Sequence, residues 1–219
     1  MSSEELYLDE IPDLIIEGDI KGTRTLAAKA LEAGVDAQVL ITRYLVPAME
    51  EVGRLFECGE YFVSEMLVSA RAAGGILELA EPYLAQGEHK ATGVVVTGTV
   101  KGDMHDIGKN IVNMMLRGSG FQVVDLGTDV GPAKYIQAIR EHNPDIIGMS
   151  ALLTTTMNVM GEIIQAVSNE GMRNQVKILV GGAPITQAFA DAVGADGYAP
   201  DAAASVRLAR RLIEEKKSS

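Results

Sequence analysis

The sequence predicts an α plus α/β architecture, in which a helical bundle precedes a five-stranded parallel sheet covered by helices. Two observations lead to this prediction. Residues 4–85 show only the apolar spacing of helices, whereas short apolar runs alternate with helical stretches from residue 92 onward. Regular alternation of strand and helix is typical of a parallel sheet with helices on both faces.

The first part of the chain is predicted to form four short helices, which together make a small antiparallel bundle. Their ranges are residues 4–17, 22–33, 38–56 and 63–84. The last helix has the clearest pattern, since Met66, Ala70, Ala73, Leu77, Ala80 and Leu84 recur at steps of four and three. Pro47 lies inside the third range and is expected to kink or split that helix.

A polar, glycine-containing segment separates the two patterns. We place a linker at residues 87–91, between a helical domain at 1–86 and an α/β domain at 92–219. The predicted strands are residues 93–97, 122–126, 145–150, 177–180 and 196–199. The predicted helices between and after them are residues 107–118, 132–142, 157–170, 186–193 and 201–215. Five strands in this length fit a small doubly wound sheet.

Composition narrows the classes of function. The net charge of −11 and pI of about 4.7 argue against binding of a nucleic-acid backbone. Cys58 is the single cysteine, which excludes an intramolecular disulfide and fits a reducing compartment. The first residues lack the apolar core of a signal peptide, and no uncharged apolar run approaches the ~20 residues of a membrane span. We therefore expect a cytoplasmic protein without membrane partners.

Three unusual segments follow predicted strands. They are Gly102–Gly108 after the first strand, Ser150–Thr156 after the third and Gly181–Pro184 after the fourth. Ligands of open α/β sheets bind outside the carboxyl ends of the strands, where the strand order reverses. In a flavodoxin-like order the first and third strands flank that point, so these loops are expected to converge on one edge.

His105 is the most informative residue of the first segment. A lone loop histidine is more often a solvated or hydrogen-bonded residue than a ligand, and a metal site built from protein normally recruits three or four side chains. One histidine is sufficient where a macrocycle supplies the other ligands. Asp103 can accept the proton of one ring nitrogen and leave the other free to ligate. The alternative for Asp103 is an ordinary turn or helix-cap residue.

The glycines and the hydroxyl residues of these segments can each have either a ligand-binding role or a local structural role. Gly102, Gly108 and Gly181-Gly182 allow backbone to approach a bulky ligand closely, or they form ordinary turns. Ser150 and Thr154–Thr156 place several hydroxyls at one strand end, where hydroxyls often only satisfy local backbone groups.

Taken together, the three segments resemble a known signature. Asp-x-His-x-x-Gly ending at Gly108, then Ser150-x-Leu152, then Gly181-Gly182, stand in order at matching spacings. This pattern resembles the cobalamin-binding signature of base-off/His-on corrinoid proteins, which include cobalamin-dependent methionine synthase, the corrinoid subunits of methyltransferase systems and the B12-dependent mutases. The resemblance implies a Rossmann-like binding domain and a cobalamin (corrinoid, cobalt) cofactor, with methylcobalamin as an intermediate.

The resemblance also implies a role for each matching residue. His105 becomes the lower cobalt ligand, Asp103 bonds its other nitrogen, and Thr156 completes the relay at a position where the family more often has Ser. Ser150 would bond the benzimidazole of the cofactor tail. The other residues implied in cofactor binding are Met104, Asp106, Ile107, Gly108, Leu152, Thr154, Gly181, Gly182, Ala183, Tyr198 and Ala199, with Asp201 near the tail pocket.

The helical part resembles the cap of methyltransferase corrinoid proteins, which covers the upper face of the corrin. The residues that carry this likeness are Pro47, Met49, Val52, Gly53, Phe56, Gly59, Glu60, Phe62, Glu65, Met66, Leu67 and Ala70. Apolar residues at helical spacing also make an ordinary core. Mutase domains usually lack such a bundle, so it favours a methyl carrier, and the Gly87 linker is a plausible hinge for cap movement.

The implied function is carriage of a methyl group on cobalt, without catalysis of demethylation by this chain alone. The implied partners are a substrate-specific methyltransferase, a second methyltransferase for tetrahydrofolate or coenzyme M, and a reductive activase. Methylamines, methanol, betaines and aryl methyl ethers are donors in such systems, and nothing in the chain selects among them.

Three other functions remain as alternatives. A B12-binding regulator or photoreceptor is disfavoured because the chain has no Trp and no length for a DNA-binding domain. A detached mutase module is disfavoured by the helical part. A receiver-like phospho-acceptor domain requires an Asp at the end of the third strand, where this chain has Ser150.

Overall fold

The computed structural model describes residues 7–84 and 91–218 and divides the chain into two compact units. The helical unit comprises the described residues up to Ala91 together with Met114–Gly120. The α/β unit comprises Thr92–Asn113 and the chain from Phe121. The expected linker at 87–91 falls almost entirely outside the described residues. The predicted domain boundaries therefore remain a proposal.

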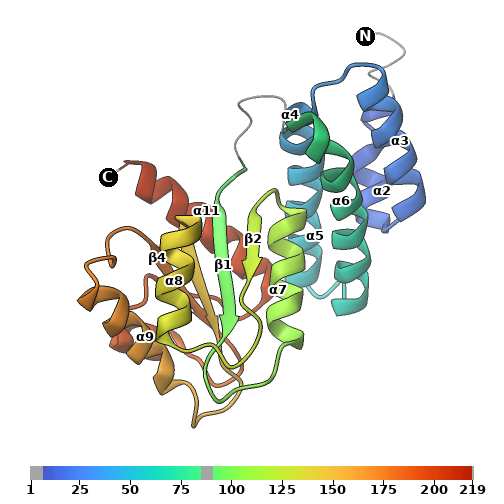
Figure 1. Ribbon diagram of the computed structural model, residues 1–219. Coiled ribbons are helices and arrows are strands. Elements are labelled where there is room, and N and C mark those ends of the chain that lie inside the picture. The colour runs from blue at the N-terminus through green and yellow to red at the C-terminus, as the bar shows by residue number, and fades with distance from the viewer. Residues whose placement is uncertain (1–6, 85–90, 219) are drawn as a thin grey trace. The chain divides into compact units, whose positions relative to one another are not determined.

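Within residues 11–84 of the helical unit, helices occupy the greater part of each of the four ranges that the sequence predicts (Figure 1). They are α2 (Ile11–Glu17), α3 (Ile20–Glu32), the run α4 (Ala37–Val39), η1 (Leu40–Leu45) and α5 (Val46–Glu57), and α6 (Val63–Leu84). Side chains of Asp19 and Asp36 accept backbone N–H groups at the starts of α3 and α4, which satisfies donors that a helix leaves unpaired. α3 packs along α6, and small residues of α6, among them Ala70 and Ala73, are buried.

Of two helix predictions that involve a proline, one needs correction and one is confirmed. The predicted helix over 4–17 is interrupted by a turn at Asp9-Glu10, and α2 begins at Ile11. Pro12 explains this start, because a proline lacks the N–H that a continuing helix would use. The prediction that Pro47 kinks or splits the helix over 38–56 is confirmed, because a π-helical stretch, η1, ends at Leu45 and α5 begins at Val46, one residue before the proline. A π-helical turn is wider than an α-helical turn, and it is one way for a helical run to accommodate a proline.

The α/β unit is a five-stranded parallel sheet in the order β2-β1-β3-β4-β5. The strands are β1 (Val94–Thr99), β2 (Gln122–Asp125), β3 (Ile146–Ser150), β4 (Lys177–Gly181) and β5 (Gly197–Tyr198). The helices are α7 (Ile107–Gly118), α8 (Pro132–His142), α9 (Asn158–Asn169), α10 (Gln187–Val193) and α11 (Ala202–Ser218). The predicted fold class is confirmed, and each element lies within a few residues of its predicted range.

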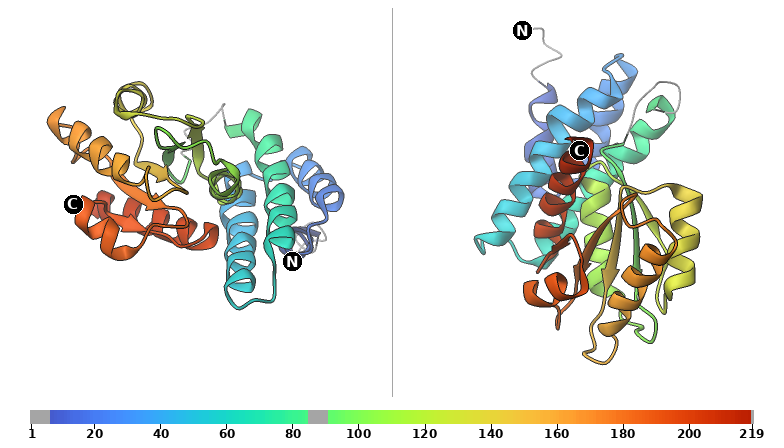
Figure 2. Two further views of the ribbon diagram at one scale, coloured as in Figure 1. Left: turned by 90° about the horizontal axis from the view of Figure 1, so that it is seen from below. Right: turned by 90° about the vertical axis from the view of Figure 1, so that its left-hand side faces the viewer.

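The sheet has a core on each face. On one face Val96, Ile147 and Ile178 pack with side chains of α8 and α9, including the fully buried Tyr135 and Ile163. The other face is covered by α11, where a side chain added at Gly93 would meet Ile213. Figure 2 shows α8 and α9 on one side of the strands and α11 on the other. This layering leaves the carboxyl ends of the strands free of helices.

Candidate functional site

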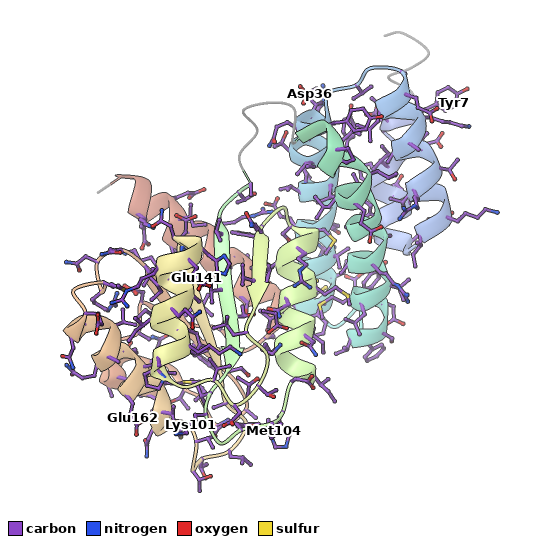
Figure 3. The ribbon with its side chains drawn as sticks, viewed as in Figure 1. Tyr7, Asp36, Lys101, Met104, Glu141 and Glu162 are labelled. Carbon is purple, nitrogen blue, oxygen red and sulfur yellow. The ribbon has the colours of Figure 1, made fainter. Side chains whose placement is uncertain are left out.

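The three segments singled out in the sequence meet at one edge of the sheet. β1 pairs with β3 and β3 with β4, and the register places Thr99 opposite Ser150 and Ser150 opposite Gly181. The segments therefore leave their strands at the same level. β1 and β3 are also the strands between which the chain order reverses, so the convergence lies at the switch point of the sheet. In Figure 3, Lys101 and Met104 lie at this lower edge, beyond the end of β1.

Asp103 is the centre of the site and is fully buried. Its Oδ1 accepts hydrogen bonds from the His105 backbone N–H at 3.0 Å and faces His105 Nδ1 at 2.8 Å. Its Oδ2 accepts hydrogen bonds from the Thr156 hydroxyl at 2.9 Å and from the backbone N–H groups of Leu152 and Leu153 at 2.8 and 3.2 Å. One carboxylate thus joins the loop after β1 to the loop after β3.

Burial alone would raise the pKa of the Asp103 carboxyl group, because it disfavours the charged form. The hydrogen bonds from Leu152, His105 and Thr156 outweigh this effect and hold that pKa well below its usual range. An ionised carboxylate only accepts hydrogen bonds, so the proton between Asp103 and His105 is assigned to Nδ1. In a neutral imidazole with this tautomer, Nε2 carries the lone pair.

His105 presents that lone pair on an exposed apolar surface. Its side chain is 52% exposed. Met104 and Ile107 beside it are 69% and 77% exposed, and Leu152 and Leu153 are also exposed. Large apolar side chains gathered around one imidazole are suited to contact with a flat apolar ligand.

The two predicted groups of glycines differ in what surrounds them. A Cβ at Gly108, in the first turn of α7, would have no atom within 4 Å. Gly182 has a φ of +124°, and a Cβ there would overlap the Ala151 carbonyl oxygen. The Ala151 N–H also donates to the Gly181 carbonyl at 3.2 Å. Gly182 is therefore needed for the loops themselves, whereas the protein leaves the space beside Gly108 open.

The remaining predicted residues are placed as follows. Ser150 is half-buried at the end of β3, and Thr154 and Ala183 are exposed in the two loops. Asp106 is exposed and accepts a hydrogen bond from Asn110 at 3.1 Å. Tyr198 pairs with Val180 across β4 and β5, and Ala199 donates its N–H to Val180. Asp201 lies before α11 and accepts the N–H of Ala204.

Sequence reasoning missed three residues that support the site. Thr99 donates its hydroxyl to the His105 carbonyl at 2.9 Å. Asp129, with a φ of +56°, accepts the Gly102 N–H at 2.8 Å. Lys109 is buried, and its Nζ lies 2.6 Å from Asp125 Oδ2. Lys109 directly follows the glycine of the signature, but neither Asp129 nor Thr99 has a pattern in the sequence that marks it.

The possible metal ligands at this site fit a metal whose other ligands come from a macrocyclic cofactor. Among residues 7–84 and 91–218 there is no group of three or more His, Cys, Asp or Glu side chains placed to hold an ion. A protein-built centre requires such a group. A single oriented imidazole on an exposed apolar surface instead suits a macrocyclic cofactor. In the same part of the chain no helix is long and apolar enough to cross a membrane.

Comparison with known proteins agrees with this chemistry. A family model described as a B12 binding domain matches residues 93–207, and a second model with the same description matches residues 7–81. The dimethylamine corrinoid protein 2 of Methanosarcina acetivorans is 43% identical over 216 residues, which cover 97% of this chain and 99% of that protein.

Two solved structures are similar over most of the chain. The methanol:cobalamin methyltransferase complex of Methanosarcina barkeri aligns with a TM-score of 0.83 and 32% identity, covering 96% of this chain and 80% of that one. A cobalamin-binding protein of Desulfitobacterium hafniense aligns with a TM-score of 0.79 and 32% identity, covering 94% and 98%. The chain therefore belongs to the cobalamin-binding corrinoid proteins of methyltransferase systems.

Proposed function

We propose that the protein binds cobalamin base-off/His-on and carries a methyl group between two methyltransferases. His105 Nε2 is the lower ligand of the cobalt. The observation that carries this proposal is the pair of contacts on Asp103, which favours the proton on His105 Nδ1 and, in a neutral imidazole, leaves Nε2 to bind a metal. Bound cobalamin supplies a cobalt ion that accepts and gives up a methyl group.

Asp103 and Thr156 keep His105 ready for reversible ligation. A lower ligand of a methyl carrier must bind and release in each cycle, so its other nitrogen needs a stable partner in both states. The carboxylate stays ionised because the Thr156 hydroxyl and the Leu152 and Leu153 amides hold its second oxygen. An ionised carboxylate would therefore keep the Nδ1 proton on the imidazole.

The residues at the ends of β3 and β4 are proposed to hold the cofactor tail. Ser150 is half-buried between the two loops and offers a hydroxyl for the displaced benzimidazole. Leu152, Thr154, Gly181, Gly182 and Ala183 surround the same edge, and Tyr198 and Ala199 lie on β5 and just beyond it. Met104, Asp106, Ile107 and Gly108, which flank His105 in the chain, would line the site for the corrin ring.

The first partner is proposed to be a substrate-specific methyltransferase, and the second passes the methyl group to tetrahydrofolate or coenzyme M. A reductive activase restores the cofactor after adventitious oxidation. The similar proteins are named for dimethylamine and for methanol, so closely related folds serve different donors. We propose that the donor is selected by the partner. Reconstitution with single purified methyltransferases and their donors, each scored for methyl transfer to this chain, identifies it.

The decisive experiment is an absorption spectrum of the protein reconstituted with methylcobalamin. Wild type is expected to show a His-ligated spectrum, and His105→Ala a base-off spectrum with the cofactor still bound. His142→Ala is the matched control, because His142 lies at the end of α8 and is expected to leave the spectrum unchanged. Failure of wild type to bind cobalamin, or a His-ligated spectrum in His105→Ala, contradicts the proposal.

A further inference from the structure

The loop that carries His105 begins with a tight turn over Val100–Asp103. The Asp103 N–H donates to the Val100 carbonyl at 3.1 Å, and Gly102 has a φ of +83°. A φ of about +80° at the third residue is that of a type II turn. Type I and type II turns differ by rotation of the central peptide, whose N–H here belongs to Gly102. The orientation of that N–H therefore reports which turn is formed.

Asp129, in the connection between β2 and α8, holds this turn at two points. Its Oδ1 accepts the Gly102 N–H at 2.8 Å, and its own N–H donates to the Asp103 carbonyl at 3.1 Å. Asp129 is itself held in place, because the next residue, Val130, exchanges backbone hydrogen bonds with Thr99 and Lys101. The side chain thus fixes the central peptide of the turn, between Lys101 and Gly102, and the backbone fixes the peptide that follows Asp103.

The backbone of Asp129 supports a specific role for this residue. Its φ of +56° lies in the left-handed region, which disfavours most residues and which Asp and Asn tolerate better than others. Asn143, at the end of α8, is the other non-glycine residue with a positive φ in the described chain. Glycine adopts a positive φ more readily than either Asp129 or Asn143. The backbone conformation alone therefore does not require a carboxylate at residue 129, and its role must lie in the groups that it binds.

We propose that Asp129 is a positioning residue for His105, and this inference rests on the proposed role of His105 as the cobalt ligand. Asp129 keeps the turn in the form that directs the Asp103 carboxylate at both His105 Nδ1 and Thr156. Without the Asp129 side chain the central peptide is free to rotate, and the Asp103 backbone is held by fewer contacts. The Asp103–His105 hydrogen bond then weakens, and His105 presents Nε2 less often.

Two variants separate the side chain from the backbone conformation. Asp129→Gly removes the acceptor without a penalty at positive φ, whereas Asp129→Asn keeps both an acceptor oxygen and tolerance of that φ. With methylcobalamin bound, Asp129→Gly is expected to raise the ratio of base-off to His-ligated spectrum about fivefold, the loss of roughly one hydrogen bond. Asp129→Asn is expected to stay within about twofold of wild type. Asn143→Gly, the control matched in φ, is expected to leave the ratio unchanged.

A second readout needs no cofactor. Nuclear magnetic resonance of protein labelled with ¹⁵N-histidine distinguishes the two imidazole tautomers, and His105→Ala assigns the His105 signals. Wild type is expected to hold the Nδ1–H tautomer, and Asp129→Gly to gain the Nε2–H tautomer. Equal tautomer and spectral ratios in wild type and Asp129→Gly overturn the inference, as does an Asp129→Asn variant as impaired as Asp129→Gly. If wild type fails to bind cobalamin, the proposed function fails, and the tautomer measurement still decides the role of Asp129.

Discussion

At the scale of single residues, the site depends on one buried carboxylate. The sequence indicates that Asp103 can bond His105, because the two lie two residues apart in a turn. It does not indicate that Leu152 and Leu153 donate their backbone N–H groups to the same carboxylate, from 49 and 50 residues further along the chain. Among the hydrogen bonds that lower the pKa of Asp103, the one from the Leu152 amide has the largest effect.

The charge on Asp103 predicts a pH-dependent contribution to the stability of the protein without cofactor. Its pKa is lowered in the folded state, so the contribution is fully present above the unfolded value of about 3.9. It is lost as pH falls toward the folded pKa. Asp103→Asn removes the contribution, because an amide cannot accept hydrogen bonds from donors on both sides. We expect the variant to be about 3 kcal/mol less stable at pH 7.

Urea unfolding of wild type and Asp103→Asn from pH 7 to pH 3 measures this effect. The difference in free energy of unfolding is expected to be constant down to about pH 4 and to shrink below it. A difference that does not change with pH would mean that hydrogen bonding, without the charge, accounts for the loss.

At the scale of elements, the ends of the strands show why similar glycines have different roles. Gly182 continues from β4 on a course that brings it against Ala151, where β3 ends. Gly108 lies in the first turn of α7, a position at which alanine is the better helix former. A motif read from the sequence contains both residues without distinguishing them. The difference arises from which backbone lies opposite each glycine.

Substitution by alanine is predicted to separate the two roles. Gly182→Ala is expected to lower the free energy of unfolding by at least about 2 kcal/mol, because it adds strain at positive φ and overlaps the Ala151 backbone. Gly108→Ala is expected to leave that free energy within about 1 kcal/mol and to weaken cobalamin binding. Urea unfolding without cofactor and a binding titration measure the two effects. Normal cobalamin affinity in Gly108→Ala would show that the open space there is not used by the ligand.

At the scale of the whole molecule, the proposed binding residues all belong to the α/β unit. They run from Asp103 to Asp201, and each lies outside Met114–Gly120, the part of this stretch that belongs to the helical unit. The single cysteine, Cys58, is exposed and belongs to the helical unit. A ligand that binds only the folded protein must therefore stabilise at least the α/β unit.

We predict that methylcobalamin raises the unfolding temperature of the α/β unit. At a free concentration about 100 times the dissociation constant, the expected stabilisation is about 2.7 kcal/mol. Calorimetry with and without cofactor measures it, and His105→Ala should show a smaller shift at the same concentration. Equal shifts in the two proteins would argue against ligation by His105.

The sequence by itself determined the order of elements, the α plus α/β class and the cofactor family. The order and class of the elements follow from the apolar periodicity of each segment, which is a local property of the chain. The cofactor family follows from the spacing of the three loop segments along the chain. The sequence did not determine the break before Ile11 or the π-helical stretch before Val46, because a proline admits several local solutions. Only the tertiary structure decided that Leu152, Leu153 and Asp129 support the His105 loop. Leu152 and Leu153 act through backbone N–H groups, which almost every residue type carries. Asp129 acts through its carboxylate, but the contact it makes joins two loops that are far apart in sequence.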